Sequence, residues 1–308
     1  MAISKHKNVL SAPIVRGLRL IDPEFFALDA KLLSAIGQGD ARAAAWAISA
    51  GADPNKLTSQ GDLPLGLAAR ANDFATASAL MDAGASPARA DGHGFTALMW
   101  AACGGFDCVE LLLSRSDLMA KDARGMLAVQ IAAWEERCGL DAFKLLLAAT
   151  PQPSEGPPLT SWAAMCPRSD KLAHLLDAGA DPFALDSQGR SALHMAAKHG
   201  RVASIDLLAR AGAGSLALKE DGSAERRLPV EMALASRRPE AAAHLCRLAP
   251  NTIERALRYG TAQGYSEDAG FKGFWDRFCV LALIEMERRD IELGLHCSQS
   301  ARARAPRL

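Results

Sequence analysis

The chain has 308 residues, with 35 lysines and arginines against 35 aspartates and glutamates, so its formal net charge is zero. A protein that holds nucleic acid through its phosphates normally carries a basic excess or patch. No such patch is evident, so we do not expect a nucleic-acid partner. Hydrophobic residues make up 49% of the chain, enough for a continuous core, and aromatic residues make up only 6%. The longest late apolar run, residues 278–284, is far below the roughly 20 residues of a membrane span, so we expect a cytoplasmic protein without a membrane partner.

Seven cysteines occur, and no two of them form a Cys-x-x-Cys pair. An odd count without that spacing predicts neither a disulfide framework nor a zinc site. The cysteines are interpreted as small buried hydrophobes in a reducing compartment. No metal or cofactor is expected.

A pair of small residues recurs along most of the chain at a period near 33 residues. The pairs are Ala35-Ile36, Ala68-Ala69, Ala101-Ala102, Ala132-Ala133, Ala163-Ala164, Ala196-Ala197 and a degenerate Ala233-Leu234. A second marker, a Gly-Ala turn, keeps the same phase and begins at Gly51, Gly84, Gly179 and Gly212. Two markers in register predict a solenoid of helix–turn–helix units, each too small to bury its apolar face alone.

The sequence around these pairs resembles the ankyrin-repeat family. The matching motifs are Gly94-Phe95-Thr96-Ala97-Leu98 before Ala101-Ala102, and Gly189-Arg190-Ser191-Ala192-Leu193-His194 before Ala196-Ala197. Leu63-Pro64-Leu65 and Leu228-Pro229-Val230 fill the Thr-Pro-Leu position of the motif. The resemblance implies an all-α solenoid of stacked helix–turn–helix units with helical caps at both ends. It also implies a structural role for His194, in the turn before its helix.

Three segments follow from this reading. Residues 1–28 are expected to form an N-terminal arm and a capping helix. Residues 29–250 form six to seven repeats, of which the fifth and the seventh are degenerate. Residues 251–308 form a C-terminal helical cap and a basic tail, because Phe274, Trp275, Phe278 and Leu281 follow a helical spacing and a terminal repeat leaves an apolar face to cover. The alternative is a docking helix that offers this aromatic face to a partner.

No catalytic motif stands out. The chain has no phosphate-binding Gly-rich loop ending in Gly-Lys-Ser/Thr, no Gly-x-Ser-x-Gly turn and no His-Glu-x-x-His pair. We therefore expect a protein that is not an enzyme.

The resemblance implies where a partner binds, because ankyrin-like stacks meet partners at the loop tips and at the inner helices. Aromatic, methionine and arginine side chains among these positions are typical of protein interfaces. An exposed Trp134 would be a natural hot spot. The predicted partner-binding residues are His93, Phe95, Arg124, Met126, Trp134, Glu135, Met165, Gln188, Arg190, Lys198 and His199. The alternative for any one of them is an ordinary solvated position.

The sequence thus predicts a non-catalytic module that binds another protein through the concave face of the stack. Two alternatives remain open. One is an exported bacterial effector that acts on host proteins, which the alanine-rich composition and basic amino terminus permit. The other is a regulator or inhibitor of an enzyme that acts through residues 251–308.

Overall fold

The computed structural model describes residues 23–151, 157–213, 228–249, 252–268, 270 and 272–292, with side chains from residue 28 to residue 288. The expected N-terminal arm before residue 23 and the expected basic tail lie outside these ranges. The chain divides into two compact units, one of residues 1–132 with 137–150 and the other of residues 133–136 with 151–308. Each unit is described by itself.

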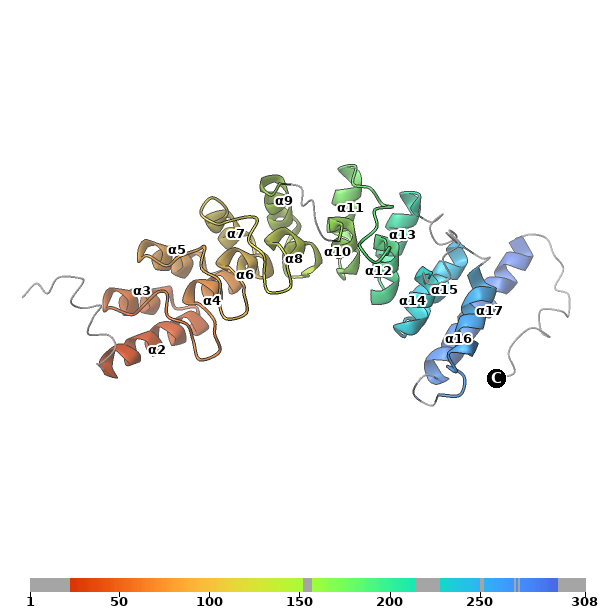
Figure 1. The fold of residues 1–308 in the computed structure, drawn as a ribbon, viewed down its shortest axis with the longest axis horizontal. Coiled ribbons are helices and arrows are strands. Elements are labelled where there is room, and N and C mark those ends of the chain that lie inside the picture. The colour runs from red at the N-terminus through yellow and green to blue at the C-terminus, as the bar shows by residue number, and fades with distance from the viewer. Residues whose placement is uncertain are drawn as a thin grey trace, which may run out of the picture. The chain divides into compact units, whose positions relative to one another are not determined.

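Within the described residues the chain forms sixteen helices, most of them in antiparallel pairs (Figure 1). The helices of the first half are α2 (Pro23–Gln38), α3 (Ala41–Ser49), α4 (Pro64–Arg70), α5 (Phe74–Asp82), α6 (Ala97–Gly104), α7 (Phe106–Leu113), α8 (Ala128–Trp134) and α9 (Leu140–Ala149). In the first unit α4 packs between α2 and α6, and α5 and α7 continue the second row from α3 to α9. The expected boundary at residue 28 falls inside α2, since no glycine or proline interrupts residues 24–36.

The second unit repeats this arrangement. Its helices are α10 (Leu159–Met165), α11 (Asp170–Asp177), α12 (Ala192–His199), α13 (Val202–Arg210), α14 (Pro229–Ala235), α15 (Pro239–Leu248), α16 (Ile253–Ala262) and α17 (Lys272–Glu292). Helix α12 contacts α10 and α14, and α13 contacts α11 and α15. The solenoid of helix pairs that the period near 33 predicts is therefore confirmed.

Small residues allow the first helices of successive pairs to approach closely. Ala68, Ala69, Ala101 and Ala102 have no exposed surface where α4 meets α6. Gly104 marks the closest approach, because a Cβ there would lie 2.3 Å from the carbonyl oxygen of Ala69. Larger residues at these positions would force the helices apart.

Helices α16 and α17 follow the last repeat and pack on it. The face of α17 that carries Trp275, Phe278 and Ala282 is buried, and α17 contacts both α15 and α16. The opposite face exposes Val280 and Ile284, at 48% and 53%. The aromatic spacing noted in the sequence thus serves the core of the second unit. Among the described helices, none is both long enough and apolar enough to cross a membrane.

Gly260→Ala is expected to loosen this C-terminal helix pair, because the new Cβ would lie 2.0 Å from the Trp275 ring. Overpacking of this kind costs about 1–3 kcal/mol. Urea denaturation should show the loss, and amide hydrogen exchange should place it in α16 and α17. Gly273→Ala is the matched control, because it lies in α17 with no atom within 4 Å of the new Cβ. Equal destabilisation by the two variants would contradict the packing assigned to Gly260.

Candidate functional site

Aspartates at the loop tips before α6, α8 and α12 build three copies of one turn. Each carboxylate accepts hydrogen bonds from the main-chain N–H groups two and four residues later, at 2.8–2.9 Å. The glycine three residues after the aspartate has a positive φ, which few other residues adopt without strain. The turns are Asp91–Phe95, Asp122–Met126 and Asp186–Arg190. They fix the backbone under six of the predicted partner-binding residues, namely His93, Phe95, Arg124, Met126, Gln188 and Arg190.

In the first unit two of these turns place aromatic and cationic side chains in one row. The rings of Phe95 and Trp100 lie 4.8 Å apart, and the Trp100 indole N–H donates to Asp91 at 2.7 Å. The guanidinium of Arg124 lies 5.9 Å from the Phe95 ring centre, and that of Arg70 lies 5.0 Å from the Trp100 ring centre. We call Arg70, Trp100, Phe95 and Arg124 the aromatic row.

The aromatic row is accessible although it is held by contacts. Phe95 and Trp100 are half-buried, and Arg70 is exposed. Arg124 pairs with Asp122 at 3.2 Å, yet its side chain remains 59% exposed. Cation–π contacts at exposed positions contribute about 0.5–1 kcal/mol each, which favours this arrangement without burying the charges.

Two of the predicted partner-binding residues, Met126 and Trp134, are less exposed than the sequence predicts. Met126 is only 6% exposed, because its flexible side chain turns from the loop into the core, so it offers a partner almost no surface. Trp134, in the second unit, is half-buried, and its indole N–H is buried without an acceptor among the described residues. Trp134 is therefore less accessible than the exposed hot spot that the sequence suggested.

Glu135 lies beside a buried cation in the second unit. Lys171 has no exposed surface, and its Nζ donates to the main-chain carbonyl of Glu135 at 2.6 Å. A buried ammonium group is costly unless such acceptors surround it. The main-chain carbonyl of Glu135 thus has a structural role, and its side chain is half-buried.

In the turn before α12, Arg190 and Asp186 form an ion pair at 2.8 Å, and Gln188 at the tip is exposed. Burial alone would raise the pKa of Asp186. Hydrogen bonds from the Arg190 N–H, the Arg190 guanidinium and the Gln188 N–H outweigh burial and hold the pKa below its usual value of 3.8. The carboxylate is therefore charged whenever the turn is formed near neutral pH.

The last three predicted residues lie at the ends of two neighbouring helices of the second unit. Met165 ends α10, and Lys198 and His199 end α12. Arg201 links them, because its Nε donates to the Met165 carbonyl at 2.9 Å. Burial and then the charges of Lys198, Arg201 and Arg238 lower the pKa of His199 below 6.5. Sequence reasoning did not select Arg201 or Arg238, which follow α12 and precede α15.

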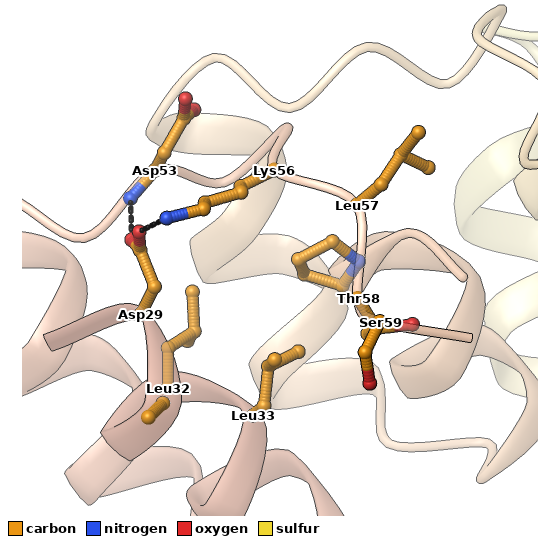
Figure 2. Close-up of a pocket in the computed structure, with 10 residues that line it drawn as sticks. Asp29, Leu32, Leu33, Asp53, Lys56, Leu57, Thr58 and Ser59 are labelled. Carbon is orange, nitrogen blue, oxygen red and sulfur yellow. Dashed lines mark hydrogen bonds and ion pairs between the residues drawn. The ribbon is translucent and has the colours of Figure 1, made fainter. Parts of the chain in front are cut away.

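A small pocket opens in the first unit between α2 and the loop before α4 (Figure 2). Its volume is about 190 Å³, and Leu32, Leu33 and Leu57 supply much of its apolar lining. At its edge the Asp29 carboxylate accepts from the main-chain N–H of Asp53 at 2.7 Å and from Lys56 Nζ at 2.8 Å. Ligand pockets usually measure about 300–1,000 Å³, so this one suits a single side chain of a partner rather than a cofactor.

The polar residues considered for chemistry have structural partners. His194 Nδ1 accepts from the Ser191 main-chain N–H at 3.1 Å, which confirms the structural role implied for His194. Burial, with the charges of Asp73 and Asp107, raises the pKa of Cys108 to about 12, so this thiol is a poor nucleophile at neutral pH. Among the described residues no group of histidine, cysteine, aspartate or glutamate could hold a metal ion.

These features define a class of protein, a helical repeat solenoid whose loop tips and first helices present a preformed surface. Two family models of ankyrin repeats match the chain, one over residues 32–122 and the other over residues 161–209. The solved ankyrin-repeat domain of Bcl-3, described as a unique member of the IkappaB protein family, is 26% identical and aligns with a TM-score of 0.51. That alignment covers 70% of this chain and 97% of the Bcl-3 domain. No curated protein sequence matches.

Residues 32–122 and 161–209 of the chain are therefore ankyrin repeats. Repeats of this family are modules for protein–protein interaction.

Asp186→Asn should lower stability at neutral pH by about 1–3 kcal/mol, because three hydrogen bonds to a buried carboxylate lose their charge assistance. The folded-state pKa of Asp186 is depressed, so its contribution is present above pH 3.8 and is lost as the pH falls through the folded pKa. Urea midpoints of wild type and variant, measured from neutral pH to below pH 3.8, should therefore converge in acid. Asp177→Asn, at an exposed residue, is the control. A gap that stays constant with pH would contradict the assignment.

Proposed function

We propose that the chain binds another protein through the aromatic row of its first unit and catalyses no reaction. The observation that carries this proposal is the stacking of two half-buried aromatic rings between two accessible guanidinium groups. Aromatic residues and arginine dominate the energetics of protein interfaces, and they do so where they lie in well-packed surroundings. The neighbouring His93, which is exposed, extends the same surface.

The aromatic row is organised before any partner arrives. Asp91 holds both the Phe95 main chain and the Trp100 indole, and Asp122 holds both the Arg124 main chain and its guanidinium. Little side-chain entropy remains to be lost on binding, so more of the contact energy appears as affinity. The fixed positions of these side chains therefore support a role in binding.

The chemistry of the aromatic row also indicates what it fits. Ring faces suit an apolar or aromatic side chain, and the guanidinium groups at both ends suit carboxylate or carbonyl oxygens. The side-chain pocket between α2 and the loop before α4 adds an apolar position in the same unit. We propose a folded or extended protein segment as the partner.

Phe95→Ala, and separately Arg70→Ala combined with Arg124→Ala, should weaken partner binding by about 2 kcal/mol or more, roughly thirtyfold in Kd. The test is affinity capture by wild type and variants, with quantitative mass spectrometry of the retained proteins and titration of any protein that wild type retains. Arg115→Ala is the matched control, because Arg115 is an exposed arginine of the same unit outside the aromatic row.

Thermal unfolding of each variant separates binding from folding. The arginine variant should unfold close to wild type because both side chains are exposed, whereas Phe95→Ala should lose some stability because its ring packs on Trp100 but should still unfold cooperatively. Partners retained equally by wild type and by both aromatic-row variants would contradict the proposal, and so would loss of a partner from Arg115→Ala alone.

A further inference from the structure

A second charged surface lies in the second unit, where two turns between paired helices come together. Lys198 and His199 end α12, Arg201 lies in the turn from α12 to α13, and Arg238 lies in the turn from α14 to α15. Helices α12 and α14 are packed against each other, as are α13 and α15, which brings the two turns side by side. We call these four residues the cationic corner.

Close contact across Gly200 fixes the geometry of the cationic corner. Gly200 ends α12 with φ 70°, and a Cβ there would lie 2.9 Å from Arg238 Cδ. The aliphatic part of Arg238 therefore lies across the Gly200 main chain. On the other side the Arg201 Nε donates to the Met165 carbonyl at 2.9 Å, so this guanidinium is also held in place.

Contacts within the structure hold Arg201 and Arg238 in place, but none of these contacts is with an acidic side chain. Among the described residues the structure records no carboxylate paired with Lys198, Arg201 or Arg238, and the only hydrogen bond recorded for these side chains goes to a neutral carbonyl. Nearby arginines do have acidic partners, as Arg277 has in Glu240 at 2.6 Å and Arg255 has in Glu231 at 2.8 Å. Burial first, and then the positive charges of Lys198, Arg201 and Arg238, lower the pKa of His199.

We propose that the cationic corner binds an acidic segment of a polypeptide. Guanidinium groups held in a fixed direction suit carboxylates, and a fixed site avoids much of the ordering cost of binding. A nucleic acid is disfavoured because its affinity depends on neutralising many phosphates, whereas this corner is small and the chain has zero net charge. An anionic membrane is disfavoured because such surfaces are recognised by clusters of about 4–8 basic residues along one helix or beside a span.

The test uses fluorescence anisotropy with a short fluorescein-labelled polyglutamate peptide at low salt. Lys198→Glu combined with Arg238→Glu should weaken binding about tenfold, since two attractions become repulsions. Arg210→Glu, a single charge reversal at an exposed residue of α13 outside the cationic corner, should leave the affinity nearly unchanged. The aromatic-row variant Arg70→Ala with Arg124→Ala should also leave it unchanged, which separates this inference from the proposed function.

Three results would overturn the inference. They are no binding of polyglutamate by wild type, an equal loss of binding in Arg210→Glu, and tighter binding of an oligothymidylate of matched charge or of phosphatidylserine vesicles than of the peptide. Circular dichroism of each variant shows whether it is folded. If the double reversal fails to fold, Lys198→Gln with Arg238→Gln takes its place, with an expected loss of about threefold.

Discussion

The close contact between first helices of neighbouring repeats is the constraint on which the rest of the structure depends. Where α4 meets α6, and again where α10, α12 and α14 meet, alanine pairs with no exposed surface bring the helix backbones together. A repeat of about 33 residues can place its loop tip beside the next one only if this spacing is kept. The alanine pairs therefore set the register of every surface discussed above.

Buried polar groups form hydrogen bonds that hold the surface loops in place beside the packed helices. The turn aspartates accept hydrogen bonds from the main chain of their loop tips. Before α14, Glu231 accepts from the Leu228 main-chain N–H and pairs with Arg255. Lys171 is fully buried with its Nζ on the Glu135 carbonyl. The turn aspartates are satisfied within their own loops. Lys171 and Glu231 have partners on other elements, so they are satisfied only when those elements keep one arrangement. The same hydrogen bonds that form the turns leave Phe95, Arg124 and Gln188 in fixed positions for a partner.

The repeat architecture could be predicted from the sequence because the alanine pairs and the glycine turns recur with the same phase. The loop-tip positions followed from that phase, and the structure does set His93, Phe95 and Arg124 close together. Solvent exposure did not follow from phase alone. Met126 occupies the same place in its turn as Phe95, yet Met126 is almost fully buried whereas Phe95 is half-buried. Lys198 and His199 of the cationic corner were predicted, but Arg201 and Arg238 were not, because they are 37 residues apart and come together only through helix stacking.

The most direct test of the central claim is the stability of Ala101→Leu, measured by urea denaturation and by hydrogen exchange of α4 and α6. Ala101 has no exposed surface between these helices, so the larger side chain should cost about 1–3 kcal/mol and should increase exchange in both helices together. Ala45→Leu, at an exposed position of α3, should change stability little, since leucine is nearly as good a helix former. Equal stability and unchanged exchange in Ala101→Leu would show that the alanine pairs do not set the spacing of the repeats.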